Sequence, residues 1–263
     1  FLSTAIAGYS DLKRLTSTVN HNFSTGVDVL STEKGKQDTA KFNSTIFRGT
    51  VQYVINDKIS LQPGFEFNRD AATGQRINGS PIINDYAFFV SSEIKPVKGI
   101  NIRPGFRFVK NSVYDAPPII PSLNTKLSLN ENFDLRLAYA KGFRSPALRE
   151  LYYDFVDASH NIIGNPNLKA EESNSFNGSL TWAGLKNDNF QFRSTLAGFY
   201  NLFKNRIAFL QSTNDASVTT LFNIAKFKTT GFTLDNTLIY SNINATIGVS
   251  YIGRYNDQLE SNP

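Results

Sequence analysis

The side chains best suited to chemistry lie in one polar stretch, residues 142–173. His160 carries an imidazole, which in its neutral form is a good metal ligand. Tyr152 and Tyr153 carry flat faces against which a ring-shaped ligand can stack. Arg144, and with it Arg149, carries a guanidinium that binds carboxylates through paired hydrogen bonds. These residue types predict a ligand-binding site in this stretch.

The same residues also have a structural interpretation. The two tyrosines and the nearby Phe155 can pack a loop or form part of an aromatic belt. Arg144 can be held by Glu150, by Asp154 or by a neighbouring strand. Glu171 and Glu172, which close the stretch, are expected at a solvated loop end.

The rest of the composition argues against catalysis and against nucleic-acid binding. The chain has two histidines, His21 and His160, far apart in sequence, and no Ser/His/acid spacing suggests a catalytic triad. It has no cysteine, so neither a disulfide nor a thiolate metal site is expected. Its net charge of +5 comes from scattered basic residues, which indicates a solvated surface and not a nucleic-acid footprint. We therefore expect that the protein is not an enzyme, has no intrinsic cofactor and does not bind nucleic acid.

Two nearly identical segments, 59–67 and 100–108, reveal the elements that must position these side chains. Both carry Pro-Gly-Phe followed by a charged residue and a second Phe. Apolar and polar residues alternate through each segment, and a strand points successive side chains to opposite faces. Each segment is therefore predicted to be a strand with one apolar and one polar face. Pro63 and Pro104 cannot donate to a ladder, so we place them near a rim.

The remaining strands follow a rhythm of short turn and long loop. Asn/Asp/Gly turns predict tight hairpins, and longer loops are expected near 69–83, 110–121, 142–173 and 208–218. We count about eleven strands, the first within 3–20. The others are expected at 47–55, 59–67, 86–90, 100–108, 123–129, 133–139, 176–182, 190–200, 219–240 and 243–255.

Short turns at one end and long loops at the other are typical of an antiparallel up-and-down transmembrane β-barrel. Mean hydropathy is −0.27, but a membrane barrel needs only alternate residues to be apolar. No apolar run approaches the roughly 20 residues of a spanning helix, and no helical period is evident. The fold class predicted is all-β, a partial barrel. A soluble β-protein that binds glycans is the alternative, and it predicts that the phenylalanine faces pack against a second layer.

Two boxes in the polar stretch carry a family resemblance. The first is Phe143, Arg144, Ser145 and Pro146, and the second is Asn165, Pro166, Asn167 and Leu168. Between them runs Leu148-Arg-Glu-Leu-Tyr152, and later motifs begin at Asn223 and Tyr251. Together they resemble the TonB-dependent outer-membrane receptors, especially those of Bacteroidetes-like bacteria. The family's first box has Ala where this chain has Ser145.

The resemblance implies a 22-stranded barrel that encloses an N-terminal plug. Residues 1–263 would form part of a single β-barrel domain, with the plug and the closing strands absent from this chain. The implied location is the bacterial outer membrane. The implied partners are its lipids, a TonB complex reached through the missing N-terminal region, and a surface lipoprotein as a candidate.

Within this family, haem receptors carry a histidine between the two boxes, the interval that His160 occupies. The resemblance thus implies import of an iron complex, with haem favoured and His160 as ligand to its iron. Cobalamin and siderophore receptors carry the same boxes and are the alternatives. An outer-membrane enzyme is a more distant one, for which no catalytic cluster can be assembled.

Overall fold

A computed structural model describes residues 2–33, 36–156, 160–187, 189–212, 215 and 217–256. Nearly all of its regular structure is β-strand. The strands are β1 (Leu2–Ser17), β2 (Val19–Asn22), β3 (Val27–Leu30), β4 (Gln37–Asn56), β5 (Ile59–Thr73), β6 (Ile82–Ile94), β7 (Ile100–Asn111), β8 (Ile120–Ser128), β9 (Phe133–Arg144), β10 (Asp154–Val156), β11 (Asn161–Ile163), β12 (Glu171–Lys186), β13 (Phe190–Gln211), β14 (Thr219–Tyr240) and β15 (Ile243–Asn256). One helix, α1 (Leu148–Tyr152), interrupts them within the described part of the chain.

Thirteen of these strands form one sheet. Eleven of the thirteen make an antiparallel meander in the order β1, β4 to β9, and β12 to β15. The short strands β10 and β11 come from the long loop after β9, and β11 pairs in parallel with β14. The prediction of about eleven up-and-down strands in an all-β fold is confirmed for the described residues.

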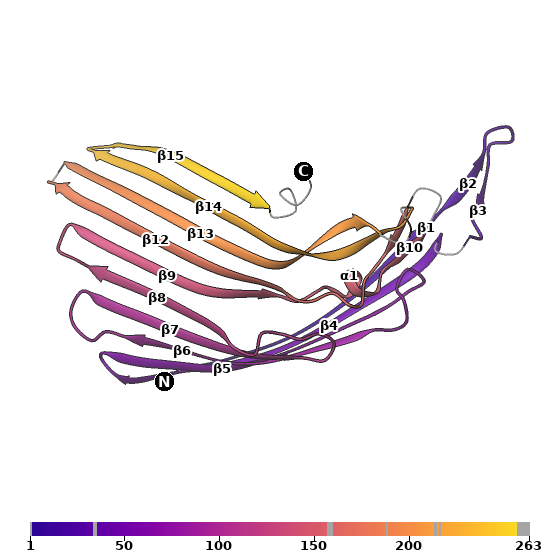
Figure 1. The fold of residues 1–263 in the computed structure, drawn as a ribbon, viewed down its shortest axis with the longest axis horizontal. Helices are drawn as coiled ribbons and strands as arrows, with labels where there is room; N and C mark the ends of the chain where they lie inside the picture. Colours follow the sequence, from indigo (N-terminus) through magenta and orange to yellow (C-terminus); the bar gives the residue numbers. More distant parts are fainter. Residues whose placement is uncertain are drawn as a thin grey trace.

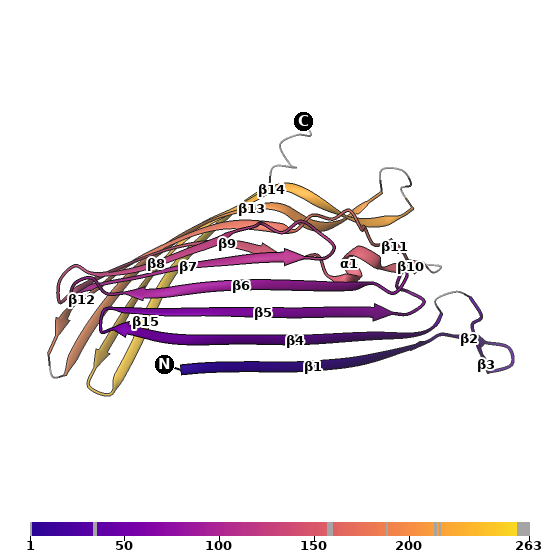
Figure 2. The same cartoon turned by 90° about the horizontal axis from the view of Figure 1, so that it is seen from below.

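The sheet curves into an open trough (Figures 1 and 2). Its two edge strands are β1, which pairs only with β4, and β15, which pairs only with β14. They do not pair with each other, so the sheet is not closed. The short turns lie together at one end of the trough, and the long loops lie at the other, where the β2–β3 hairpin projects furthest (Figure 2). This is the geometry of part of a barrel wall.

The outward face of the trough is apolar and aromatic. Phe65 and Phe88 are about half exposed, at 47% and 52%. Aromatic rings pair along this face, as Phe47 does with Phe65 at 5.5 Å between centroids and Phe88 with Phe108 at 6.5 Å. No second protein layer covers them in the described residues, so this surface suits a hydrocarbon environment and not a sandwich.

The inward face is polar, as the repeated segments 59–67 in β5 and 100–108 in β7 illustrate. The two copies differ at three inward positions, one of which is Glu66 in β5 and Arg107 in β7. These side chains meet at 2.7 Å across the small Ala87 of β6. The guanidiniums of Arg48 and Arg107 also lie 5.0 and 5.6 Å from the ring centroid of Phe89. The opposite charges of the two copies at this position therefore make a complementary ion pair.

The prolines lie near the short-turn end, as predicted. Pro63 is five residues into β5, and the register between β4 and β5 has no pairs for Gln62 and Pro63. The ladder between β6 and β7 is likewise interrupted at Pro104. Both gaps follow because proline has no N–H to donate.

Several boundaries differ from the sequence prediction. The strands run further toward the loop end than expected: β4 begins at Gln37 and β13 ends at Gln211. The upper part of β4 is mostly polar, and the upper part of β13 carries the unbroken apolar run Ile207–Leu210. Neither segment shows the alternation that locates a strand. The expectation of no helix was wrong by one short turn, α1. No described helix is long and apolar enough to cross a membrane.

The packing of Gly64 makes a prediction for the barrel wall. A Cβ on Gly64 would lie 2.4 Å from the ring of Phe89 and 2.8 Å from the backbone oxygen of Gly49. We expect Gly64→Val to destabilise the barrel by about 1–3 kcal/mol, because the ring and backbone must move. Gly198→Ala is the matched control, since its Cβ would meet no atom closer than 3.6 Å. Thermal unfolding in detergent measures both, and equal midpoints would contradict this account.

Candidate ligand-binding site

The loop between β9 and β12 folds back inside the curve of the sheet, where α1 lies (Figure 2). There it builds the main buried cluster of the described residues. The cluster joins two loops to three strands, β6, β13 and β14. Its members are Ile83, Tyr114, Leu151, Leu168, Ala170, Ile207 and Leu221. We call this packed unit the loop platform.

The first family box anchors the platform by packing. Pro146 and Leu151 have the most completely buried large side chains of the described residues, each under 2% exposed. The ring of Phe143 lies 6.1 Å from that of Tyr114, which comes from the loop after β7. The backbone N–H of Ala147 donates to Glu150 at 2.7 Å, which stabilises the first turn of α1. The box thus sets where the helix begins.

Arg144 joins the helix to the barrel wall. Its guanidinium donates to Glu150 at 2.9 Å and to Glu171 at 2.8 and 2.9 Å. Glu171 also accepts the backbone N–H of Ile207 at 2.7 Å. One side chain therefore connects α1, β12 and β13. We call these three charged residues the arginine clamp.

The prediction that Glu171 and Glu172 form a solvated loop end was wrong. Both are only partly exposed and begin strand β12. Glu172 lies 3.2 Å from Lys141, and Glu171 belongs to the arginine clamp. Their charges attract these partners across strands, which sequence adjacency could not reveal.

The second family box ties the loop to β14. The side-chain amide of Asn165 donates to the backbone oxygen of Leu221 at 2.9 Å, and its side-chain oxygen accepts the N–H of Asn167 at 2.9 Å. The second bond is the local turn expected for Asn before Pro. Leu168 then buries its side chain in the platform, with 3% exposed.

A third motif residue, Asn223 of β14, closes the same end of the loop. Its side-chain oxygen accepts the N–H of Lys169 at 2.8 Å, and its amide donates to the backbone oxygen of Lys169 at 2.9 Å. It also donates to the backbone oxygen of Asn205 at 2.7 Å, where β13 bends through a positive φ of 56°. The motifs that are separated in sequence thus meet in one hydrogen-bonded unit.

The platform presents an aromatic and cationic column on its surface. The rings of Phe155 and His160 stack at 4.9 Å with 19° between their planes. The guanidinium of Arg76, from the loop after β5, lies 4.2 Å from the centroid of Phe155. Arg149 lies 4.5 Å over Tyr153, which is itself 5.7 Å from Phe155. Among these groups, His160 and Arg149 are exposed.

The structure thus divides the predicted site residues into two groups. His160 and Tyr153 lie together in the column, whereas Tyr152 packs against the platform core and Arg144 is held in its clamp. Arg76 was missed, because it belongs to another loop and no nearby motif marks it. An isolated bridge between Ile77 and Tyr153 brings the two loops together.

The described residues contain no metal-binding cluster. No group of three or more His, Cys, Asp or Glu side chains is arranged there to hold a metal ion. His21 lies in the β2–β3 hairpin, 2.6 Å from Asp28. The two histidines therefore belong to different loops.

Tyr114 connects the platform to the barrel wall through its hydroxyl. The hydroxyl donates to Asp85 at 3.1 Å. Burial of the ring raises the pKa of this phenol well above its ordinary value, and the nearby negative charge of Asp85 adds to the shift. The platform therefore holds Tyr114 in its neutral form.

An outward-apolar β wall with a loop packed on its inner side is characteristic of outer-membrane β-barrels. A sequence model described as "TonB dependent receptor-like, beta-barrel" matches residues 3–263. The chain belongs to this family, which comprises outer-membrane receptors and transporters and not enzymes. None of the curated proteins matches the sequence.

Solved receptor structures share the fold. The siderophore receptor PirA from Pseudomonas aeruginosa is 19% identical, with a TM-score of 0.64 over 83% of this chain and 50% of that one. A ferric enterobactin receptor, PfeA, from the same species is 17% identical, with a TM-score of 0.69 over 95% of this chain and 41% of that one. The FrpB iron transporter from Neisseria meningitidis is 14% identical, with a TM-score of 0.67 over 97% and 42%. This chain therefore spans half or less of these receptors.

We predict that Arg144→Gln loosens the loop platform. The substitution leaves Glu150 and Glu171 without their shared cation. Breaking a fully buried ion pair lowers the free energy of unfolding by about 3–5 kcal/mol. The loss is expected to be smaller here, because the clamp is partly exposed. Limited proteolysis should then cut within 145–170 faster than in the parent receptor. Lys169→Gln is the control, because this loop residue is tied through its backbone. Equal cleavage rates for the two variants would refute the clamp.

The raised pKa of the Tyr114 phenol predicts that the folded protein loses stability at alkaline pH. Its folded-state pKa is raised above the ordinary value of 10.0, so its contribution is complete below pH 10 and falls as pH rises further. Tyr114→Phe has no proton to lose, and its melting temperature should therefore decline less between pH 9 and 11 than that of the parent. Parallel declines in both proteins would show that Tyr114 does not carry this dependence.

Proposed function

We propose that this chain forms part of a receptor that captures a flat, anionic iron complex at the aromatic and cationic column and imports it across the outer membrane. Haem is the favoured cargo. The observation that carries the proposal is the stack of His160 on Phe155, with the guanidinium of Arg76 over the same ring. The complex is the substrate of transport and undergoes no bond chemistry here.

Each member of the column has a chemical part in capture. The exposed imidazole of His160 is of the type that binds haem iron axially. The guanidiniums of Arg76 and Arg149 suit carboxylate groups such as porphyrin propionates. Phe155 and Tyr153 have guanidiniums or an imidazole over their rings, so they hold these groups in position. The column thus combines a metal ligand with anion-binding groups.

A siderophore is the second candidate cargo, favoured by the two guanidiniums of the column. Cation–π contacts orient Arg76 and Arg149 over aromatic rings at 4.2 and 4.5 Å. An anionic ferric siderophore needs such cations and has no need of an imidazole. Cobalamin, which the family also carries, has less to gain from them.

Transport itself requires parts outside this chain. A plug inside the barrel and a TonB complex on the periplasmic side would supply the gate and the energy, as the family resemblance implies. The Bacteroidetes-like motifs add a surface lipoprotein as a candidate partner at the loop end. The platform would hold the capture surface fixed while the plug moves.

The test separates the two cargoes in the full-length receptor. We expect His160→Ala to weaken haem binding by about tenfold or more, as lost metal ligation and its supporting groups typically do. The same variant should leave ferric siderophore binding unchanged. Arg76→Gln combined with Arg149→Gln should weaken binding of either anionic complex. Titration followed by haem absorbance and by tryptophan fluorescence measures these affinities.

His21→Ala is the matched control, since His21 lies in a different loop and pairs with Asp28. It should bind as the parent does. Unchanged haem affinity in His160→Ala, with the barrel assembled, would reject haem as cargo. Unchanged affinity for every iron complex in the double arginine variant would reject the column as a capture site.

A further inference from the structure

A row of polar side chains crosses the inward face of the sheet near the short-turn end. On β7, Asn101 and Arg103 alternate with outward residues and so share the inward face of Arg107. Directly opposed residues on antiparallel strands also share a face. Lys126 of β8 lies opposite Asn101, and Arg136 of β9 lies opposite Lys126. All of these side chains therefore point into the trough.

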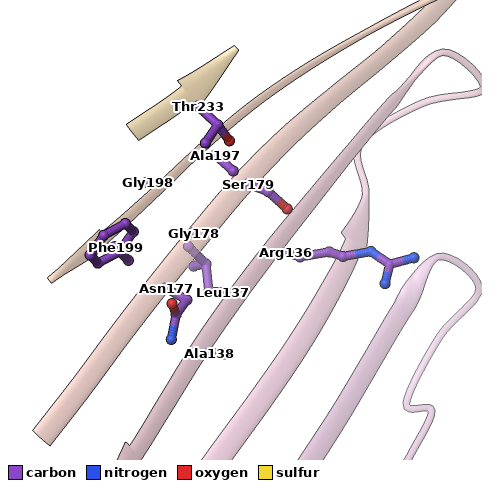
Figure 3. Close-up of a pocket in the computed structure, with 10 residues that line it drawn as sticks. All are labelled: Arg136, Leu137, Ala138, Asn177, Gly178, Ser179, Ala197, Gly198, Phe199 and Thr233. Atoms are coloured by element: carbon purple, nitrogen blue, oxygen red, sulfur yellow. The ribbon is translucent and has the colours of Figure 1, made fainter. Parts of the chain in front are cut away.

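Three hollows follow this inward face from the middle of the wall to the short-turn rim. The first, of about 290 Å³, lies over Arg136 and over Ser179, its opposed residue on β12 (Figure 3). The second, of about 600 Å³, shares Arg136 with the first and adds Arg103 and Lys126. The third, of about 580 Å³, shares Lys126 with the second and reaches the turn at 95–99 between β6 and β7. We call the three hollows together the inner groove.

The inner groove carries an excess of positive charge. Two carboxylates contact its cations within the described part of the chain. Glu93 pairs with Lys95 at 2.9 Å and accepts from Arg103 at 3.1 Å, and Asp134 pairs with Lys126 at 3.1 Å. The basic residues that line the groove are six, namely Lys58, Lys95, Lys98, Arg103, Lys126 and Arg136. An anion that enters the groove is therefore attracted to it.

The wall gains no stability from this excess. Lys126 directly opposes Arg136, and like charges opposite each other on neighbouring strands are destabilising. Asp134 is shared between Lys126 and the hydroxyl of Ser128, which donates to it at 2.6 Å. Among the described residues, no carboxylate forms an ion pair with Arg136. The side chain of Arg103 is 62% exposed, so it is accessible to a ligand although it contacts Glu93.

From this arrangement we propose that the inner groove is an exit site for the anionic iron complex. The groove binds the complex after it leaves the capture column and before its release into the periplasm. This step rests on the proposed function, because the cargo is the same. The column lies at the loop end of the trough, whereas the groove continues to the short-turn rim (Figure 2). The two sites thus follow one another along the inner side of the wall.

The groove has the chemistry that such a step needs. The guanidiniums of Arg103 and Arg136 suit the carboxylate groups of a porphyrin or a siderophore. The lysines at the rim extend the positive potential to the short-turn end, so the attraction continues in the direction of exit. Contacts to partly exposed cations are individually weak, which lets them guide the complex without retaining it.

Two variants of the full-length receptor test the groove in cells that contain the TonB complex. The first combines Arg103→Gln, Lys126→Gln and Arg136→Gln. The second combines Lys58→Gln, Lys98→Gln and Arg136→Gln, and it breaks no ion pair between described residues. The probes are haem and an anionic ferric siderophore, both labelled with radioactive iron. We expect the maximal uptake rate to fall by about tenfold in the first variant and less in the second. Surface binding in de-energised cells should equal that of the parent.

A rescue and a control separate charge in the groove from charge elsewhere. Arg103→Lys with Arg136→Lys keeps the positive charges and should restore most of the uptake rate. The control combines Lys13→Gln, Lys41→Gln and Lys110→Gln, which removes the same charge from the loop end of β1, β4 and β7. It should take up iron as the parent does. All variants should keep the parental melting temperature in detergent.

The outcomes distinguish the exit site from the capture site. Parental uptake in both groove variants, with surface binding intact, would overturn the exit site alone. An equal loss of uptake in the control would also overturn it, as would a lowered melting temperature in both groove variants, because the cations would then hold the barrel or its plug. Absence of surface binding of either complex in the parent would instead overturn the proposed function, and the exit site with it.

Discussion

The cross-strand register is the constraint on which the rest of the molecule depends. Because side chains alternate along a strand, a slip of one residue would exchange every inward group for an outward one. The register sets Glu66 level with Ala87 and within 2.7 Å of Arg107, and it places Phe65 and Phe88 outside. In hydrocarbon such a slip would expose ion pairs to lipid. The apolar alternation and the inward ion pairs therefore select the same register.

A wall of this kind buries few side chains, so the molecule concentrates its core elsewhere. The main buried cluster lies at the loop end, where Leu151 and Leu168 pack against residues such as Ile83 and Leu221. The arginine clamp fixes this cluster to the strands through partly exposed charges. A loop that faces water is thereby packed against the barrel and bonded to it. This packing brings residues from different loops, such as Arg76 and His160, to the same ring of Phe155.

Alternation was enough to predict the meander from sequence, since each apolar band marks where a strand crosses the membrane. It could not mark the upper part of β4, where both faces are mostly polar, or that of β13, where four successive residues from Ile207 to Leu210 are apolar. It also missed α1, since a single helical turn is too short to show a period. The polar stretch 142–173 was found from its motifs. The contribution of Arg76 was not, because loop–loop contacts such as Ile77 with Tyr153 leave no local pattern.

The division between platform and column explains why family motifs indicate the receptor class and not its cargo. Residues of the two boxes, including Pro146, Asn165 and Leu168, are used for burial and for hydrogen bonds to the barrel. These contacts join the loop to the strands of the barrel and are not part of the exposed column. The exposed surface is made by His160 and Arg149, which lie between the boxes. Under the proposed function, substitutions there would change which complex is bound without disturbing the platform.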